Sequence, residues 1–267
     1  MSAGNIDSTA IIGQDVALGE GVVIGPYAVI EEGAVLGSHC HIHSHAVIKK
    51  HAVLGEGVEV GHFSVIGGDP QHLTFDRFLA SFAEVGSRTR IGEGVTIHRS
   101  IEPNGKTVVG EDSFLMGYSH VAHDCTLENK VVLANGVLLG GHVTIGCETF
   151  IGGGAAVHQF VRIGNGAMIG GLAEISLDIP PQVLVSGRNV ISGLNLIGLK
   201  RRKVPINEIS ELKKVFRRVF EQTNVKKVAK EILGGEDAPD SSICLDFLSF
   251  FGTGTRGFAK AQRHSGD

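Results

Sequence analysis

The chain has 267 residues, a net charge of −4 and a sequence pI near 6.3. This length is enough for one solenoid and a small appendage, and the bulk charge argues against a nucleic-acid-binding protein. No apolar run approaches the ~20 residues of a membrane span, and the N-terminal residues lack the charged start and apolar core of a signal peptide. We therefore expect a cytoplasmic protein without stable membrane insertion.

From the N-terminus, an aliphatic residue recurs at every sixth position through the first two thirds of the chain. A small residue often lies two positions earlier, as at Ala28 and Cys40, and a glycine often follows, as at Gly25 and Gly37. The aliphatic series is Ile12, Leu18, Ile24, Ile30, Leu36, Ile42, Ile48, Leu54, Val60, Ile66, Ile91, Ile97, Val109, Leu115, Val121, Leu127, Leu133, Leu139, Ile145, Ile151, Val157, Ile163, Ile169 and Ile175.

A period of six fits neither a helix nor a flat strand alone. It is typical of short strands, each followed by a turn, that wind into a parallel β-helix of hexapeptide repeats. The aliphatic residue and the small residue before it then share the inward face, which places Cys40 and Cys125 in the core. We expect the glycine after each aliphatic residue to mark the corner, where it supplies backbone freedom. The four cysteines show no CxxC spacing, so they indicate neither a metal cluster nor a disulfide framework.

Two segments interrupt the repeat. The first, residues 68–85, contains Pro70, which stops a strand, and phenylalanines that should anchor an ordered loop. The second, residues 101–106, replaces one hexad and leaves the phase of the repeat intact. Loops that leave a solenoid are where such proteins usually carry function.

Thirteen histidines are present, and the spacing of several of them in the sequence predicts that they lie close together in the fold. If three hexads make one coil, residues 18 apart stack directly, with neighbouring strands ~4.8 Å apart. His123, Gly141 and Gln159 then form one column, and His142 and His158 lie one place to either side. His120 lies nearby on the preceding strand. Such convergence favours a functional site, with solvated histidines of no role as the alternative.

His98 does not fall in this column. The arithmetic places it on a different face of a single subunit, and a threefold assembly would bring it to the cluster. Three imidazoles on one edge could also hold zinc with one open position. No thiol or evident carboxylate completes that set of ligands, so we predict no metal.

The six-residue period ends near residues 178–182, and apolar residues recur at helical spacing from about residue 200. We expect helices over 206–220, 225–233 and 243–251, with Gly234 and Gly235 ending the second of them. The chain therefore divides into a β-helix over 1–185 and a helical domain over 186–267.

The sequence resembles the UDP-N-acetylglucosamine acyltransferase family, which catalyses the first step of lipid A biosynthesis, over nearly its whole length. That family has a left-handed parallel β-helix and forms a homotrimer with sites between subunits. The motifs that carry the resemblance are His120-Val-Ala-His-Asp-Cys125, Leu139-Gly-Gly-His142, Ala156-Val-His-Gln-Phe160, Val95-Thr-Ile-His-Arg99, Asp178-Ile-Pro-Pro181, Gly198-Leu-Lys-Arg-Arg202 and Phe250-Phe with Thr255-Arg-Gly257.

The resemblance implies transfer of a 3-hydroxyacyl chain from 4′-phosphopantetheine-linked acyl carrier protein to the 3-hydroxyl of UDP-N-acetylglucosamine, without a metal or other cofactor. It implies that His123 is the general base and that the backbone N–H of Gly141 stabilises the oxyanion. Asp124 would orient His123. Because adjacent side chains on a strand point in opposite directions, that bond requires an irregular corner.

The same resemblance implies a set of residues that bind the sugar, the nucleotide and the pantetheine. Gly171 matches the position that limits acyl length, and a glycine there implies a deep slot for a long chain. Arg201 is suited to the diphosphate by its fixed fork of donors. The full set is His72, Thr74, His98, His120, His142, His158, Gln159, Gly171, Asn195, Arg201 and Arg202.

The sequence also departs from the family. Pro70-Gln-His-Leu-Thr74 stands where the family usually has Pro-Gln-Asp-Leu-Lys, so His72 and Thr74 replace an acidic and a basic sugar-contacting residue. Ile197 replaces a glutamate near the nucleotide. An N-acyltransferase acting on the 3-amino analogue of the sugar is therefore the main alternative. More distant alternatives are a zinc carbonic-anhydrase-like solenoid and a purely structural solenoid.

Two further features lie in the C-terminal third. A concentration of basic residues predicts a docking surface for the acidic acyl carrier protein, with a solvated helix face as the alternative. The run Gly252-Thr-Gly-Thr-Arg-Gly257 has the form G-x-G-x-x-G, but it follows no strand and opens no long helix, so we interpret it as a turn. The basic residues are Lys200, Arg201, Arg202, Lys203, Lys213, Lys214, Arg217 and Arg218.

Overall fold

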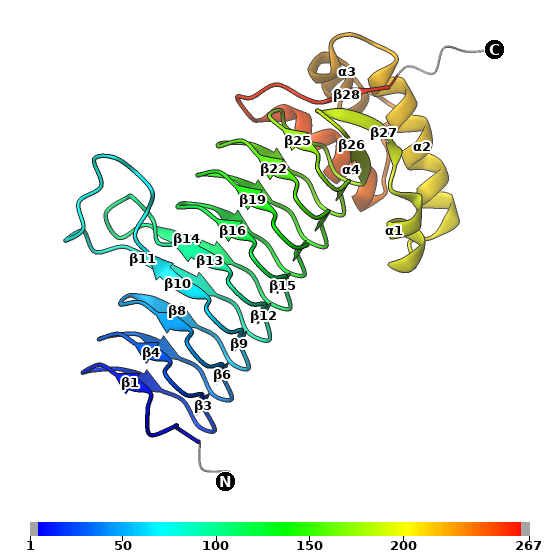
Figure 1. The fold of residues 1–267 in the computed structure, drawn as a ribbon. Coiled ribbons are helices and arrows are strands. Elements are labelled where there is room, and N and C mark those ends of the chain that lie inside the picture. The colour runs from blue at the N-terminus through cyan, green and yellow to red at the C-terminus, as the bar shows by residue number, and fades with distance from the viewer. Residues whose placement is uncertain (1–4, 263–267) are drawn as a thin grey trace.

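A parallel β-helix forms most of the protein in the computed structural model, which describes residues 5–262. Each hexad contributes one short strand, usually of two residues, and three successive strands belong to three different sheets. One coil therefore takes three hexads, and the coils stack along the long axis of the molecule (Figure 1).

Three sheets run along the β-helix, and their strands pair in parallel from coil to coil. Sheet 1 contains β1 (Ile11–Ile12), β4 (Val29–Ile30), β7 (Val47–Ile48), β10 (Val65–Gly68), β13 (Thr96–His98), β16 (His120–Val121), β19 (Leu138–Leu139), β22 (Ala156–Val157) and β25 (Glu174–Ile175). Sheet 2 contains β2 (Ala17–Leu18), β5 (Val35–Leu36), β8 (Ala52–Leu54), β11 (Phe82–Val85), β14 (Lys106–Val109), β17 (Thr126–Leu127), β20 (Thr144–Ile145) and β23 (Arg162–Ile163).

Sheet 3 continues beyond the hexads at its C-terminal end. There β26 and β27 form an antiparallel hairpin, and β28 joins β27 in parallel. The strands of sheet 3 are β3 (Val23–Ile24), β6 (His41–Ile42), β9 (Glu59–Val60), β12 (Arg90–Ile91), β15 (Phe114–Leu115), β18 (Val132–Leu133), β21 (Phe150–Ile151), β24 (Met168–Ile169), β26 (Val183–Ser186), β27 (Val190–Leu194) and β28 (Lys260–Ala261).

The stacking of coils follows the register that the period of six predicts. Val29 pairs with Val47 and His120 with Leu138, so paired residues in uninterrupted coils are 18 positions apart. The aliphatic residues of the series are buried from Ile24 to Ile175, as are the small residues two places before them. The hexapeptide β-helix and the core positions of Cys40 and Cys125 are therefore confirmed.

We expected the glycine after each aliphatic residue to supply backbone freedom at the corner, and this explanation is wrong. Positive φ angles occur two residues later, at Tyr27 (57°) and His39 (60°) for example, and residues other than glycine adopt most of them. The glycine is needed because successive coils approach closely at this position. A Cβ on Gly37 would lie 2.6 Å from the carbonyl carbon of Gly55 in the next coil, so the corner has no room for a side chain.

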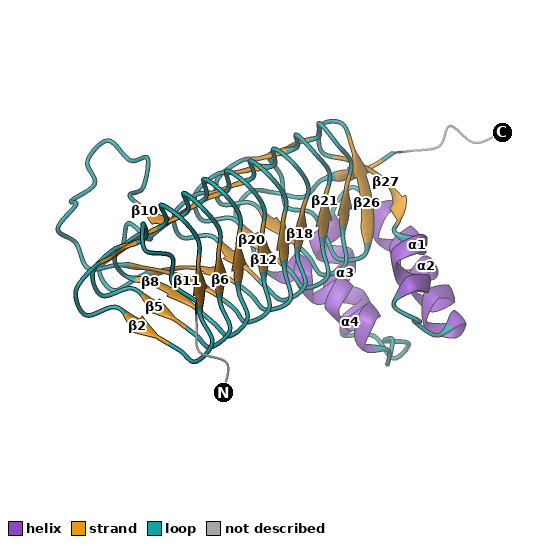
Figure 2. Cartoon of the chain, turned by 60° about the horizontal axis from the view of Figure 1, so that its bottom comes forward, coloured by secondary structure: helices purple, strands orange, loops and turns teal. Residues whose placement is uncertain are grey.

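Both interruptions of the repeat leave the coil at the same corner, between sheet 1 and sheet 2. Residues 69–81 connect β10 to β11, and residues 99–105 connect β13 to β14. Figure 2 shows the longer loop projecting from the coil beside β10. Because the second loop adds six residues, Thr96 pairs with His120, which is 24 positions later rather than 18. The phase of the hexads survives, but stacking by steps of 18 fails across this insertion.

A helical region packs at the C-terminal end of the coils (Figures 1 and 2). The expected helices are present, and Gly234 caps α3. Because sheet 3 runs on into the hairpin β26–β27, the division between residues 185 and 186 stays a prediction. In residues 5–262 no helix combines the length and apolarity needed to cross a membrane. The helices are α1 (Leu196–Arg201), α2 (Ile206–Phe220), α3 (Val225–Leu233), α4 (Ser242–Ser249) and the 3-10 turn η1 (Phe250–Gly252).

Two glycines of one N-terminal coil provide a test of this account of the corners. Gly33 has φ +70° and open space around its missing side chain, whereas Gly37 abuts the backbone of the next coil. We predict that Gly37→Ala lowers the free energy of unfolding by roughly 1–3 kcal/mol, as overpacking does. Gly33→Asn should change it by less than about 1 kcal/mol, because asparagine tolerates positive φ. Thermal and urea unfolding measure both, and equal effects would contradict the account.

Candidate active site

An open groove of about 810 Å³ follows the corner between sheet 1 and sheet 2. Six of the residues singled out in the sequence line it, and Gln71, Tyr118, Glu174, Ser176 and Arg188 line it in addition. The six are His98, His120, His123, Gly141, His158 and Gln159. The corner that carries both insertions is thus the corner that carries the histidines.

His123 and Asp124 form a hydrogen-bonded pair at this corner. His123 Nδ1 lies 2.8 Å from Asp124 Oδ2, although the two residues are adjacent in sequence. Asp124 has φ +59°, and this left-handed turn lets neighbouring side chains converge as no regular strand would. The carboxylate accepts the proton on Nδ1, which leaves the lone pair of the imidazole on Nε2.

The second insertion holds the carboxylate of Asp124 in place. Ser100 Oγ donates to Oδ1, and the backbone N–H of Ile101 donates to Oδ2 at 3.2 Å. The backbone N–H of Asp124 itself donates to Thr107 Oγ1 at 2.7 Å. Sequence reasoning missed these three supporting residues. The available signal was the position of the insertion, one coil before Asp124 at the same corner.

Gly141 lies directly over the ring of His123, as the column predicts. A Cβ on Gly141 would be 2.5 Å from His123 Cε1 and 2.7 Å from Nε2, so a side chain at this position would displace the imidazole. Within residues 5–262 the N–H of Gly141 donates to no protein acceptor. The equivalent N–H groups of Glu111 and Cys147, at another corner, each donate to an asparagine side chain at 2.8 Å. Gly141 therefore presents an open donor next to Nε2 of His123.

His98 lies in the groove beside His120, so our placement of it on a different face is wrong. The ring centroids are 4.7 Å apart, on the neighbouring strands β13 and β16. The cause is the six-residue insertion, which brings β13 and β16 into one sheet. Burial, with the positive charges that His120 and His123 can carry, lowers the pKa of His98 to about 4. Burial also lowers the pKa of His120.

The first insertion brings His72 and Thr74, which depart from the family motif, close to His123. The ring of His72 lies 6.1 Å from that of His123, and Thr74 Oγ1 lies 3.4 Å from His72 Nδ1. Gln71 of the same loop lines the groove. The loop therefore places an imidazole and a hydroxyl close to His123.

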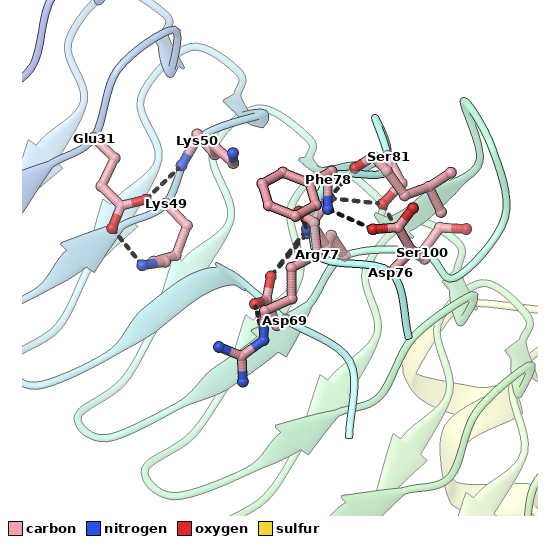
Figure 3. A network of polar contacts seen from close by, with 11 residues as sticks. Glu31, Lys49, Lys50, Asp69, Asp76, Arg77, Phe78, Ser81 and Ser100 are labelled. Carbon is pink, nitrogen blue, oxygen red and sulfur yellow. Dashed lines mark hydrogen bonds and ion pairs between the residues drawn. The ribbon is translucent and has the colours of Figure 1, made fainter. Parts of the chain in front are cut away.

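One buried arginine holds this loop, and sequence reasoning missed it. Arg99 is 1% exposed, and its guanidinium donates to Asp69 Oδ1 at 3.1 Å, to the carbonyl of Arg77 at 2.9 Å and to the carbonyl of Leu79. It also lies over the ring of Phe75, 4.8 Å from its centroid. Figure 3 shows Asp69, Arg77 and Ser81 around this network. Arg99 also donates to Ser81 Oγ at 3.3 Å, so a buried guanidinium next to β13 holds the loop through its carboxylate, two of its carbonyls and a hydroxyl.

Our sequence analysis found no carboxylate near the histidines that could hold zinc, but the structure places Asp124 beside two of them. Ligand atoms of His123, Asp124 and His142 lie within 4.8 Å of one another. His142 Nε2 is 3.9 Å from Asp124 Oδ2, and its ring stacks on Phe160 with centroids 4.5 Å apart. His158, the third imidazole considered for zinc, lies apart from this set and contacts Arg256.

The remaining predicted residues do not line the groove. Gly171 is exposed at the corner between sheet 3 and sheet 1. Asn195 caps α1, accepting from the N–H of Gly198 at 2.9 Å. Arg202 donates to Gln182 and lies 3.3 Å from a carboxylate oxygen of Glu148. Arg201, on α1, is exposed.

An imidazole held by a carboxylate, next to an open backbone N–H, is an arrangement suited to acyl transfer to a hydroxyl or amine. On a hexapeptide β-helix with a groove along one corner, it defines a hexapeptide-repeat acyltransferase. Family models agree: residues 33–68 and 106–141 match the bacterial transferase hexapeptide repeat, and residues 178–259 match the second domain of UDP-N-acetylglucosamine O-acyltransferase.

Known relatives identify the family. The chain is 37% identical over 203 residues, 75% of its length and 74% of the relative's, to an acyl-[acyl-carrier-protein]–UDP-N-acetylglucosamine O-acyltransferase of Agrobacterium fabrum. It is 42% identical over 198 residues, 73% and 71% of the two chains, to the protein of that name from Gloeothece citriformis. The solved UDP-N-acetylglucosamine acyltransferase from Campylobacter jejuni matches with a TM-score of 0.90 and 33% identity, over 97% of this chain and 100% of that one.

The protein therefore belongs to the UDP-N-acetylglucosamine O-acyltransferase family and is an acyltransferase. The same matches confirm the left-handed parallel β-helix with a helical C-terminal region.

The depressed pKa of His98 predicts how stability depends on pH. The unfolded chain binds a proton at His98 below about pH 6.5, whereas the folded protein does so only near pH 4. His98 therefore disfavours folding progressively as the pH falls through this window, by on the order of 3 kcal/mol in total. We predict that His98→Gln loses less stability than the native protein between pH 6.5 and 4 in urea unfolding. His39→Gln, which removes an exposed histidine, is the control, and identical pH profiles for the native protein and His98→Gln would contradict the assignment.

Proposed function

We propose that this protein transfers a (3R)-3-hydroxyacyl chain from acyl carrier protein to the 3-hydroxyl of UDP-N-acetylglucosamine, the first step of lipid A biosynthesis. The observation that carries the proposal is the His123–Asp124 pair beneath the open N–H of Gly141. The names of the relatives support the choice of donor and acceptor.

The chemistry needs one base and one oxyanion donor. Nε2 of His123 takes the proton of the sugar 3-hydroxyl as that oxygen attacks the thioester carbonyl. The carbonyl oxygen becomes an anion and accepts the N–H of Gly141. Collapse of the tetrahedral intermediate breaks the carbon–sulfur bond, and the pantetheine sulfur leaves with the proton that His123 carries. Asp124 stabilises the imidazolium during these steps.

Binding of both substrates involves residues beyond one subunit in this proposal. A homotrimer, with sites between subunits, would bring Asn195, Arg201 and Arg202 of one copy towards the groove of another. Arg201, which is exposed, would then hold the diphosphate. Gly171, at an exposed corner without a side chain, would leave depth for a long acyl chain. No cofactor takes part; the donor's 4′-phosphopantetheine arm belongs to acyl carrier protein.

Charge on α2 supports docking of the acidic carrier protein. Lys213, Lys214, Arg217 and Arg218 are all exposed, while the opposite face of the helix is buried. Such a concentrated basic face would steer an acidic partner towards the groove.

Turnover with purified protein tests the proposed reaction. We expect ester formation from 3-hydroxyacyl carrier protein and UDP-N-acetylglucosamine, unaffected by a chelator. His123→Ala should lower kcat by about 10²–10⁴-fold, and Gly141→Ala by at least about 10²-fold through displacement of the ring and of the oxyanion donor.

The same assay offers the 3-amino analogue of the sugar. Amide formation from that analogue alone would show that His72 and Thr74 mark a change of acceptor and would overturn the proposed substrate. Loss of turnover on chelation would favour metal chemistry at His123, Asp124 and His142 instead.

Charge reversal tests the docking surface. We predict that the double variant Lys213→Glu, Arg217→Glu raises the KM for acyl carrier protein at low salt, with the difference shrinking as salt increases. Reversal of Arg90 and Lys130, which are exposed on the coils, is the matched control. If the two double variants have the same KM for acyl carrier protein, α2 is not the docking surface.

A further inference from the structure

The C-terminal turn that follows η1 reaches back to the active-site groove. Arg256 Nη2 lies 3.0 Å from His158 Nδ1, and His158 lines the groove two coils beyond His123. Figure 1 shows the red C-terminal segment running beside the last coils near β25. The G-x-G-x-x-G run, which we interpreted as a turn, therefore has a contact with the site.

A buried ion pair fixes this turn on the β-helix. Asp178 is fully buried and accepts from Arg162 Nε at 2.9 Å. The guanidinium of Arg162 also donates to Thr253 Oγ1 at 2.6 Å and to the carbonyl of Thr253 at 2.9 Å. Gly254 has φ +93°, and a Cβ there would lie 2.2 Å from Asp178 Oδ2. The turn can pack in this way only with glycine at position 254, and it delivers Arg256 to a defined place.

The contact between Arg256 and His158 determines where the imidazole proton lies. A guanidinium only donates hydrogen bonds, so His158 Nδ1 must accept, and the ring must be neutral with its proton on Nε2. The carbonyl of Gln159 lies 3.3 Å from the same nitrogen and would require the opposite tautomer. The shorter contact comes from the charged group, and a proton on Nδ1 would face the donors of Arg256. We therefore assign His158 Nδ1 as an acceptor of the hydrogen bond from Arg256.

Two histidines of one groove thus receive opposite partners. The carboxylate of Asp124 holds the proton of His123 on Nδ1 and leaves Nε2 as a base. The guanidinium of Arg256 occupies Nδ1 of His158 and leaves Nε2 as a donor. An imidazole can therefore remove a proton at position 123 and donate a hydrogen bond at position 158.

We propose that Arg256 is a positioning residue that fixes His158 as a neutral imidazole with its proton on Nε2, so that His158 donates a hydrogen bond to a neutral acceptor oxygen of a bound substrate. This inference rests on the proposed function. Carbonyl and hydroxyl oxygens of this kind occur on both the pantetheine arm of the donor and the sugar, and the KM that changes identifies which of them His158 contacts.

Kinetics of two Arg256 variants test the assignment. Arg256→Met should raise the KM of one substrate about fivefold to tenfold, the value of one neutral hydrogen bond, with a smaller effect on kcat. Arg256→Lys keeps a cation that only donates and should recover most of the loss. In a His158→Ala background Arg256→Met should have no further effect. Full additivity of the two substitutions, or failure of lysine to recover any binding, would overturn the proposal.

The tautomer of His158 can be measured by NMR without any enzymatic turnover. In protein labelled with ¹⁵N-histidine, the His158 resonances, assigned by their loss in His158→Gln, should show a proton on Nε2 and none on Nδ1. Arg256→Met should give a mixture of tautomers, and Lys260→Met, which removes an exposed cation from the same segment, should not. A proton on Nδ1 in the native protein would overturn the inference. Because this readout needs no acyl transfer, its failure is distinguishable from failure of the proposed function.

Discussion

The hydrogen-bonded stacking of one coil on the next is the constraint on which the site depends. Parallel pairing at a register of 18 residues puts Gly141 over His123, at a distance that leaves no space for a side chain. The imidazole of His123 and an open N–H donor are therefore held together by the same backbone hydrogen bonds that stabilise the fold. The site needs no flexible loop to bring these two groups into position, which is the preorganisation that oxyanion stabilisation requires.

Interruptions of the ladder supply what the regular coil lacks. The insertion after β13 provides Ser100 and Ile101, which fix the carboxylate of Asp124. The insertion after β10, held by the buried Arg99, brings His72 towards His123. Both insertions leave the same corner, so departures from the repeat are concentrated at the proposed catalytic site. The regular coils elsewhere are the scaffold that positions them.

Much of the fold and part of the site could be predicted because the hexads from Val109 to Ile175 are uninterrupted, which makes the column of His123 and Gly141 a matter of counting. His98 could not be placed, because the residues within an insertion do not reveal which sheet the next strand joins. The bond between His123 and Asp124 depends on the positive φ of Asp124, which recurs at this position of the hexads but which the six-residue period alone does not predict. Arg256 lies 98 positions from His158, and no period connects them.

The central claim is that His123 Nε2 and the Gly141 N–H act on the same reacting centre. The most direct test is a crystal structure with UDP-N-acetylglucosamine and a non-hydrolysable analogue of the acyl-pantetheine donor bound together. The account predicts the sugar 3-hydroxyl within hydrogen-bond distance of Nε2 and the donor's carbonyl oxygen on the Gly141 N–H. A sugar 3-hydroxyl bound away from His123, or a carbonyl oxygen held by another donor, would contradict it.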